Sequence, residues 1–466
     1  MARILLLNPP LLDPTYRDLG FRGNLGHIGL AYIAAVLLRA GHDVRVIDAP
    51  KLGLGLGAVA RQAEVFAPLL VGITALTSQI LEADAAAQAI KARLPKVPIV
   101  IGGYHASGSP QGTLSEFAAF DYLVEGEGEL SILELAEALA AGTRPGPIPG
   151  IWHRQGAEII RGPARPRIAD LDSLPFPAFQ LFPYRRFTGM YSVLPKSGVL
   201  SLATSRGCPF RCNFCFKSVG AEHMQRSPEN LLAEIERDLR EFSIRELVFV
   251  DETFTLDQKR TTEILEGILR RGYEKRLSWV CQSRVDCVDR ELLALMKRAG
   301  CRVISFGVET GNQRILDSIK KSITLNQARE ALQLARAAGI KTHANYIIGH
   351  PGEDQAAILD TLKFAVQADS DWASFAILVP FPGTEVERMA ARGEGGLKLL
   401  TRDWSRYGKQ VGNALEHDDI SRAQLESLHR SAYRQFYLRP SKALNLLSVL
   451  NPRSVPIYLR HSLTSH

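Results

Sequence analysis

Short β-rich runs alternate with helical patterns in two separate stretches of the 466-residue chain, and this alternation restricts the fold more than any other feature. In the first stretch the strand-like runs are residues 3–8, 43–48, 70–74, 97–101 and 120–124. Amphipathic helical patterns lie between them, for example at residues 29–39 and 79–94. Such alternation is typical of a doubly wound α/β domain with a parallel sheet, which we place at residues 1–142.

Five parallel strands predict a flavodoxin-like or Rossmann-like sheet, in which ligands bind at the carboxyl ends of the strands. Small and polar residues gather at those ends in this chain: Thr74, Thr77, Ser78, Gly102, Gly103, Gly126 and Glu127. We therefore expect a ligand site along this edge of the first domain.

The second stretch, residues 198–385, contains six further β/α units. Its strand-like runs are residues 199–204, 246–250, 277–282, 302–307, 341–347 and 372–379, and helical patterns separate them at 228–241, 257–271, 289–299, 325–338 and 354–368. Six units are too few to close the eight-stranded barrel that such units otherwise form. The pattern predicts a partial, open (β/α)6 barrel.

Residues 143–197, between the two stretches, are rich in proline, which fixes φ and removes backbone donors. We interpret them as a semi-rigid linker. A small hairpin is predicted around Gln155-Gly156-Ala157, and residues 170–184 are expected to form an extended strap. After the barrel, residues 386–466 begin as a polar segment and end in a helix-rich basic region.

The net charge of +7 is concentrated at the end of the chain, because Ser427 to His466 contain six Lys or Arg residues and no Asp or Glu. This distribution does not favour nucleic-acid binding. The basic tail is either a cap over the open barrel or a peripheral contact with anionic lipid. No apolar run approaches the length of a bilayer span, and no signal-peptide core follows Met1. We therefore expect a cytoplasmic protein.

Three of the six cysteines, Cys208, Cys212 and Cys215, stand within eight residues, in a loop that follows the first strand of the second series. Thiolates are the natural ligands of iron–sulfur clusters. Three of them from one loop can bind three corners of a [4Fe–4S] cluster, which leaves the fourth iron open for a small molecule. This is the metal site that we predict.

Two other metal sites are compatible with the same loop. A structural zinc ion needs four ligands, and His223 could supply the fourth. A closed electron-transfer cluster would take its fourth thiolate from Cys281, Cys287 or Cys301, although a free cysteine on a predicted strand or helix is usually a small buried apolar residue.

The spacing Cys-x-x-x-Cys-x-x-Cys, with Phe214 just before the last cysteine, resembles the radical S-adenosylmethionine (SAM) superfamily. The first domain is similar to the cobalamin-binding domain of one large subfamily. The segments that carry this second resemblance are Leu25 to Val44, Gly102 to Ala106, Asp121 to Glu129 and the strap Leu174-Pro-Phe-Pro-Ala-Phe. Over residues 1–385 the chain resembles the cobalamin-binding-domain radical SAM enzymes, which include the class B radical methyltransferases and the anaerobic magnesium-protoporphyrin IX monomethyl ester cyclase.

The resemblance implies that the three cysteines hold a [4Fe–4S] cluster and that SAM chelates its open iron. Residues at the strand ends then hold the rest of SAM. Asp251 and Glu252, after the second strand, stand near its methionine ammonium, and Arg284, after the third, faces its carboxylate. Glu309, after the fourth, accepts hydrogen bonds from the ribose hydroxyls, and Gly349 belongs to the turn that contacts adenine.

Several of these assignments have a structural alternative. The two acids after the second strand could cap the following helix, and Arg284 could form an ion pair with Asp286 or Asp289. His350 could face substrate or cofactor, but we expect a hydrogen-bonded turn histidine. Phe214 completes the residues that the resemblance assigns to cofactor binding in this domain.

For the first domain the resemblance implies cobalamin. The residues assigned to it are Thr74, Thr77 and Ser78, whose hydroxyls can donate to its amide side chains, Gly102 and Gly103, which leave room for its nucleotide tail, and Gly126 and Glu127. The cobalt-ligating Asp-x-His-x-x-Gly motif is missing after the first strand, where Asn8-Pro9-Pro10 stands, and we do not assign that role to His105. The alternative is a domain that has lost its ligand.

The implied activity is reductive cleavage of SAM to a radical that takes hydrogen from an unactivated carbon, followed by methyl transfer from cobalamin. Its partners are a small-molecule substrate and a low-potential electron donor, flavodoxin or ferredoxin. The alternatives are oxidation or ring closure without methylation, as in the cyclase, and a non-catalytic cobalamin or iron–sulfur sensor. Methylthiotransferases are disfavoured because no cysteine precedes Cys208.

Overall fold

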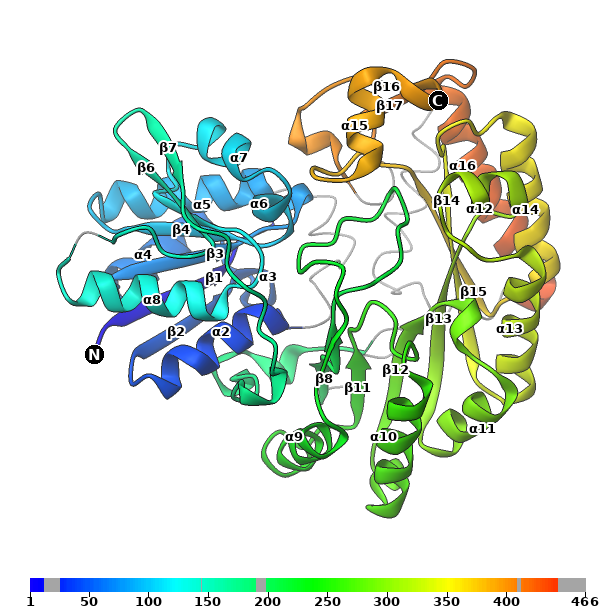
Figure 1. The fold of residues 1–466 in the computed structure, drawn as a ribbon, viewed down its shortest axis with the longest axis horizontal. Helices are drawn as coiled ribbons and strands as arrows, with labels where there is room; N and C mark the ends of the chain where they lie inside the picture. Colours follow the sequence, from blue (N-terminus) through cyan, green and yellow to red (C-terminus); the bar gives the residue numbers. More distant parts are fainter. Residues whose placement is uncertain (12–25, 144, 190–197, 409–411, 443–466) are drawn as a thin grey trace. The chain divides into compact units, whose positions relative to one another are not determined.

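The computed structural model describes residues 1–11, 26–143, 145–189, 198–408 and 412–442. The chain forms two compact units. Of the described residues, the first unit holds Met1–Thr188 together with Phe216–Gly220, and the second holds the remainder. Each unit has its own parallel sheet (Figure 1).

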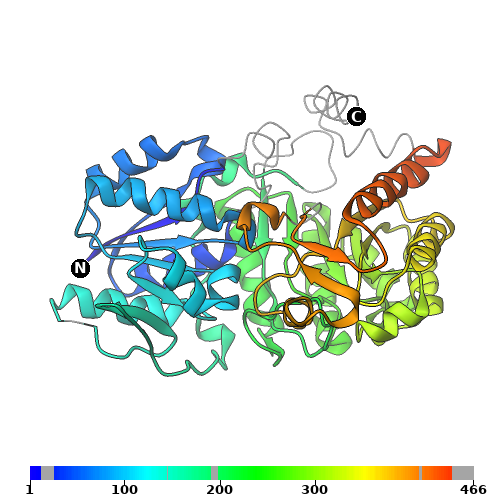
Figure 2. The same ribbon diagram turned by 90° about the horizontal axis from the view of Figure 1, so that it is seen from above.

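The first unit is a doubly wound α/β domain. Its parallel strands have the order β2-β1-β3-β4-β5, as a flavodoxin-like sheet requires. They are β1 (Arg3–Asn8), β2 (Asp43–Asp48), β3 (Leu70–Thr74), β4 (Ile99–Gly102) and β5 (Tyr122–Val124). Helices α2 (Ile28–Arg39) and α8 (Glu129–Ala140) pack together on one face, and α4 (Leu56–Phe66) and α5 (Ile80–Arg93) on the other (Figure 2). Because both faces are covered, β3 is buried at every residue.

The hairpin that the sequence analysis assigned to the linker is instead part of this sheet. Strands β6 (Ile151–Gln155) and β7 (Glu158–Arg161) continue the sheet beyond β5 by antiparallel pairing. The pairing covers the edge of β5, which would otherwise expose unpaired backbone groups. The strap is also packed: Phe179, Phe182 and Phe187 are buried against one another, and Ala178 N–H donates to Ala31 O of α2 at 3.0 Å.

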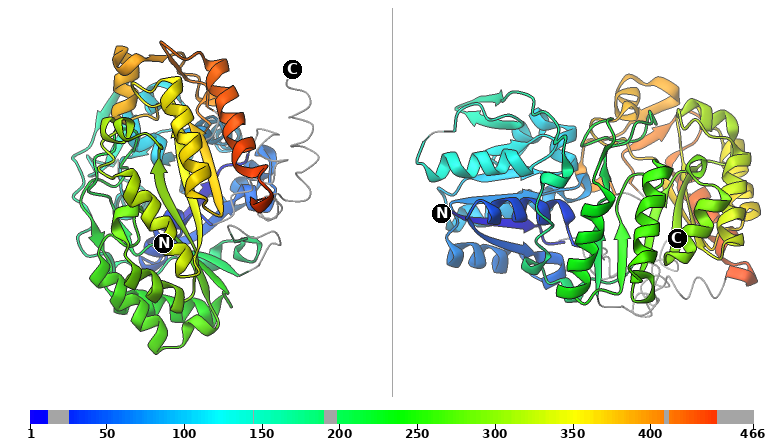
Figure 3. Two further views of the ribbon diagram at one scale, coloured as in Figure 1. Left: turned by 90° about the vertical axis from the view of Figure 1, so that its right-hand side faces the viewer. Right: turned by 60° about the horizontal axis from the view of Figure 1, so that its bottom comes forward.

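The second unit has the predicted open sheet of six parallel strands, in the order β15-β14-β13-β12-β11-β8. The strands are β8 (Val199–Leu202), β11 (Glu246–Phe249), β12 (Ser278–Ser283), β13 (Cys301–Glu309), β14 (Lys341–Ile348) and β15 (Trp372–Ile377). Five helices connect them along one face of the sheet (Figure 3): α9 (Pro228–Glu241), α10 (Gln258–Arg270), α11 (Arg290–Arg298), α13 (Leu325–Ala337) and α14 (Gln355–Ala368). The partial barrel is confirmed.

Local sequence signals start each of these helices. Their N-caps are Ser227, Asp257, Asp289, Thr324 and Asp354, and each side chain accepts a hydrogen bond from the backbone N–H three residues further on. An N-cap of this kind satisfies a donor that the helix itself leaves unpaired.

Helix α16 (Arg422–Tyr437) covers the outer edge of the barrel sheet. The Tyr437 hydroxyl accepts from Ala373 N–H at 3.0 Å and donates to Ala373 O at 2.8 Å. His429 Nε2 lies 3.0 Å from Phe375 O. Backbone groups of β15 that have no neighbouring strand are thus satisfied by α16. Most of the basic tail, residues 443–466, lies outside the described residues. No helix in the described ranges is long and apolar enough to cross a membrane.

Candidate functional site

The three-cysteine loop lies at the carboxyl end of the barrel sheet, directly after β8 and the short strand β9 (Ser205–Arg206). Cys208 and Cys212 are half-buried and Cys215 is exposed. The Cys215 N–H donates to Cys212 O at 3.2 Å, so the backbone turns within the motif. Three thiols on one such turn fit the donor set of a [4Fe–4S] cluster.

The start of this loop is fixed by Asp251, which follows β11. Its buried carboxylate accepts from three donors: Thr204 N–H, which is shared between the two oxygens (3.1 and 3.2 Å), the Thr204 hydroxyl (2.7 Å) and the Ser205 hydroxyl (2.6 Å). Neither this acid nor Glu252 caps the next helix, whose N-cap is Asp257. The helix-cap alternative is therefore wrong, and Asp251 holds the entry to the cysteine loop.

Two buried arginines hold the same segment from the helix side. Arg260 of α10 donates to Thr204 O at 2.7 Å and to Arg226 O at 2.7 Å. Arg226 donates to Ala203 O at 3.1 Å and forms a buried ion pair with Glu234 of α9 at 2.6 Å. The hydrogen bonds that Arg226 donates offset part of the cost of burying its charge.

Asn213, between the second and third cysteines, ties the loop to two later segments. Its N–H donates to Ile319 O at 3.2 Å and its side-chain amide to Ser318 O at 3.4 Å, at the end of α12 (Gln313–Ser318). Its carbonyl accepts from Val386 N–H of α15 (Glu385–Arg392) at 3.1 Å. The loop is thus fixed on both sides.

The segment after the barrel also contributes to the site, which the sequence analysis did not foresee. Helix α15, β16 (Leu397–Leu399) and β17 (Leu415–His417) form a small apolar cluster with Val386 and Leu397 at its centre. Phe214 and Ile347 pack against this cluster. No motif signals this contact, because it depends on packing between segments about 170 residues apart.

A charged group lies beside Cys212. Lys321 Nζ is 2.7 Å from Glu309 Oε1, and both side chains are buried. Burial raises the pKa of the Cys212 thiol above its ordinary value; the charges of Lys321 and Arg284 oppose this rise, and those of Glu309 and Cys208 add to it. A metal that binds this thiol must displace its proton. The sequence analysis did not single out Lys321.

Arg284 is held by the ion pair that the sequence analysis left as an alternative. Its guanidinium donates to Asp286 at 2.9 and 2.8 Å and to Lys321 O at 2.9 Å, and it lies 3.5 Å from the centre of the Phe210 ring. Asp289 instead caps α11. Arg284 therefore connects the end of β12 to the backbone at Lys321.

The turn after β14 is buried beneath β17. Gly349 has φ of 87°, a conformation that glycine adopts without strain, and His417 Nε2 lies 2.6 Å from its carbonyl oxygen. His350 packs against Phe214 with ring centres 5.6 Å apart. Neither nitrogen of His350 has a hydrogen-bond partner among the described residues, so the expected hydrogen-bonded turn histidine is wrong. Burial lowers its pKa to about 3, which keeps the imidazole neutral.

Glu353 stabilises this turn and makes it sensitive to pH. Its carboxyl group accepts from Gly349 N–H at 2.6 Å and from His350 N–H at 3.0 Å. Burial nevertheless raises its pKa from 4.5 to about 7. Because the folded pKa is the higher one, the stability that Glu353 contributes is present below pH 4.5 and is lost as the pH rises through 7.

We expect Glu353→Gln to remove this pH dependence, since an amide oxygen accepts the same two hydrogen bonds and carries no proton that titrates. Thermal unfolding of both proteins across this pH range measures the difference, which amounts to at most about 3 kcal/mol. An unchanged pH profile in the variant would contradict the assignment.

The other candidate metal ligands have different partners. Burial and a hydrogen bond with Cys301 raise the pKa of the Cys281 thiol, and the Cys287 thiol donates to Asp286 Oδ1 at 3.9 Å. His223 Nδ1 lies 3.2 Å from the Gln225 amide nitrogen. Within the described ranges, no three His, Cys, Asp or Glu side chains are arranged to hold a single metal ion.

In the first unit, several of the residues expected to bind a ligand lie at the carboxyl ends of adjacent strands. Thr74 ends β3 and Gly102 ends β4. Gly103 has φ of 98°, and a Cβ there would lie 2.7 Å from Ala75 O and 2.9 Å from Thr74 Oγ1. Only glycine fits this close approach between the ends of β4 and β3.

The remaining residues of that set differ in their surroundings. Thr77 is buried at the start of the short turn Thr77–Gln79, which includes Ser78. Gly126 N–H donates to Ser107 Oγ at 3.0 Å. Glu127 accepts from Ile168 N–H at 3.0 Å, two residues before the strap. His105 is buried, and burial lowers its pKa to about 4.

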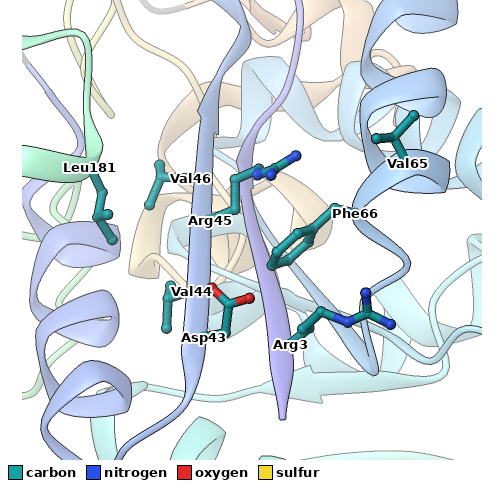
Figure 4. A pocket seen from close by; sticks show the side chains of 8 residues that line it. All are labelled: Arg3, Asp43, Val44, Arg45, Val46, Val65, Phe66 and Leu181. Atoms are coloured by element: carbon teal, nitrogen blue, oxygen red, sulfur yellow. The ribbon is translucent and has the colours of Figure 1, made fainter.

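A pocket of about 490 Å³ opens at the opposite, amino end of the first sheet, beside β2 (Figure 4). Arg45 lies over Phe66, 4.4 Å from the ring centre, with Arg3 nearby and Asp43 at the start of the strand. Charged side chains on an outer strand prevent it from pairing with other chains. The pocket is therefore a feature of the outer edge of the sheet, and we do not interpret it as a ligand site.

The fold and the cysteine site define a radical SAM protein with a B12-binding domain. Family models match on both counts, for the Radical SAM superfamily at residues 202–365 and for the B12 binding domain at residues 20–136. An uncharacterized methyltransferase of Pyrococcus horikoshii is 34% identical over 442 residues, 94% of this chain and 93% of that protein. The chain belongs to the family of cobalamin-binding-domain radical SAM enzymes.

Two further comparisons agree. The anaerobic magnesium-protoporphyrin IX monomethyl ester cyclase of Rubrivivax gelatinosus is 28% identical over 438 residues, covering 92% of this chain and 77% of that protein. The radical SAM methyltransferase TsrM of Kitasatospora setae, solved with cobalamin and a [4Fe–4S] cluster bound, has a TM-score of 0.71 at 21% identity, over 95% of this chain and 83% of that one. The cofactors of this family are a [4Fe–4S] cluster, SAM and cobalamin.

Proposed function

We propose that this enzyme transfers a methyl group to an unactivated carbon of a small-molecule substrate. The observation that carries the proposal is the 34% identity to a methyltransferase along nearly the whole of both chains. When bound, the cluster and SAM supply a carbon radical and cobalamin supplies the methyl group. The electron that starts the reaction comes from a low-potential donor such as flavodoxin or ferredoxin.

The chain's own residues hold these groups in place. Cys208, Cys212 and Cys215 bind the cluster, and Asp251 fixes the backbone on which they stand. Glu309 accepts hydrogen bonds from the ribose hydroxyls. It is the last residue of β13, where the pairing register with β14 shifts between Gly307 and Glu309. A bulge of this kind redirects the side chain that follows it.

The rest of SAM and the cobalamin are held by groups at strand ends. Glu252 interacts with the methionine ammonium, and the turn at Gly349 with adenine. In the first unit, Thr74 and the glycines at 102 and 103 contact cobalamin, and we assign no cobalt-binding role to the buried His105.

Isotope-labelled SAM tests the reaction. Reconstituted enzyme, dithionite and SAM with a deuterated methyl group are incubated anaerobically with a small-molecule extract of the organism that makes the protein. We expect 5′-deoxyadenosine and S-adenosylhomocysteine in equal amounts, and a product that carries the labelled methyl group. The Cys212→Ala variant is the matched blank.

The cyclase relative favours a second candidate, oxidation or ring closure without methylation. That reaction forms 5′-deoxyadenosine without S-adenosylhomocysteine, and its product carries no label. This outcome would contradict the methyltransferase proposal. Absence of both 5′-deoxyadenosine and S-adenosylhomocysteine would favour the remaining alternative, a non-catalytic sensor.

A further inference from the structure

Two polar side chains meet at the carboxyl ends of β1 and β2, in the first unit. Asn8 is the last residue of β1 and Asp48 the last of β2, and the two are partners in the parallel register of these strands. The Asn8 side-chain amide donates to Asp48 Oδ1 at 2.9 Å. Because parallel strands end at one edge of a sheet, the pair lies at the same edge as Thr74 and Gly102, where such sheets bind ligands.

This pair leaves two oxygen atoms without a hydrogen bond. Asp48 is 1% exposed, and neither its Oδ2 nor Asn8 Oδ1 has a hydrogen-bond partner among the described residues. Asp48 precedes the short helix α3 (Ala49–Leu52), but its side chain accepts no capping hydrogen bond there. A buried acceptor without a donor costs about 1 to 3 kcal/mol, and more if it is charged. A donor from outside the protein is therefore expected at this place.

Lys51 determines the charge of the group that fits. This lysine is 6% exposed, and its ammonium lies 5.8 Å from the centre of the Phe187 ring. Burial raises the pKa of the Asp48 carboxyl, and Asn8 and Lys51 oppose this rise. Because one cation already accompanies the buried carboxylate, a second is not needed to balance its charge. The two oxygens therefore suit a neutral group with two N–H donors, which is a primary amide.

We propose that Asn8 and Asp48 together accept the two N–H groups of one primary amide on the corrin ring of cobalamin. Cobalamin is the ligand of the family model that matches this unit, and primary amides surround its ring. Such a contact fixes the orientation of the ring on the first unit. The inference requires cobalamin but not methyl transfer, so it applies to both candidate reactions.

The test uses cobalamin monocarboxylates, in each of which a single primary amide is replaced by a carboxylate. Binding of cobalamin and of each derivative is measured by equilibrium dialysis for the wild type, Asp48→Asn and Asp43→Asn. In Asp48→Asn an N–H donor takes the place of the Oδ2 acceptor, so the pair suits a carboxylate better than an amide. Asp43→Asn is the matched control, because Asp43 is exposed at the opposite end of the same strand.

We expect Asp48→Asn to weaken cobalamin binding roughly tenfold and Asp43→Asn to leave it unchanged. One monocarboxylate should bind to the wild type about tenfold more weakly than cobalamin, because its carboxylate faces that of Asp48. Asp48→Asn should reverse this preference for that derivative alone. Without cobalamin, Asp48→Asn and the wild type should unfold at the same temperature.

An identical ranking of all derivatives in the wild type and in Asp48→Asn would overturn the proposal. An Asp48→Asn variant that is unfolded without cobalamin would identify Asp48 as a structural acid, and would also overturn it. If the wild type bound no cobalamin, the assignment of this cofactor to the chain would fall as well. Failure of the methylation experiment alone would leave the inference standing, because cobalamin binding is measured separately.

Discussion

A Cys212→Ala variant is expected to purify without the brown colour of an iron–sulfur cluster and to form no 5′-deoxyadenosine from SAM and dithionite. The loop supplies three thiols, and two thiolates do not hold a cluster whose fourth corner already lacks a protein ligand. The measurements are iron and sulfide content, the visible absorption spectrum and chromatography of the nucleosides.

Cys301→Ala is the matched control for this change. Cys301 is buried at the start of β13 and its thiol donates to Val303 O at 3.7 Å. Its loss removes a small buried group and should leave the cluster in place. Full iron content in Cys212→Ala, or loss of iron in Cys301→Ala, would mean that the cluster has other ligands.

An Asp251→Ala variant is expected to lose both stability and the cluster. The change leaves Thr204 N–H and two hydroxyls without their acceptor in a buried place, which costs about 3 kcal/mol or more. Because Thr204 and Ser205 lead into the cysteine loop, the same loss should reduce iron content. Thermal unfolding and iron analysis measure the two effects.

Glu252→Gln tests whether any carboxylate after β11 is needed for stability, or only that of Asp251. Glu252 is exposed whereas Asp251 is 1% exposed. Glu252→Gln should therefore keep the unfolding temperature and iron content of the wild type, whatever its effect on SAM binding. Equal unfolding temperatures for Asp251→Ala and Glu252→Gln would contradict the role given to Asp251.

Hydrophobic periodicity predicted the architecture well because it acts locally. The strand that begins at Lys341 alternates half-buried and buried residues, and α14 begins at its N-cap Asp354. The spacing of the three cysteines also needed no tertiary information. Each of these signals is complete within about 15 residues of sequence.

Contacts between distant segments could not be predicted in the same way. The Lys321–Glu309 pair depends on a β-bulge and on backbone conformations that non-glycine residues seldom adopt. The prolines of residues 143–197 suggested a linker, and they do not reveal that β6 pairs with β5. The sequence presented His350 as an ordinary turn residue. In the structure its ring packs against Phe214, and neither ring nitrogen has a hydrogen-bond partner among the described residues.

The central claim is that three thiolates leave one iron open to SAM. Metal analysis together with electron paramagnetic resonance of the dithionite-reduced protein, before and after SAM is added, tests it most directly. We expect about four irons per chain, no zinc, and a cluster spectrum that changes when SAM binds. Zinc in the loop, or a cluster spectrum that SAM leaves unchanged, would contradict the claim.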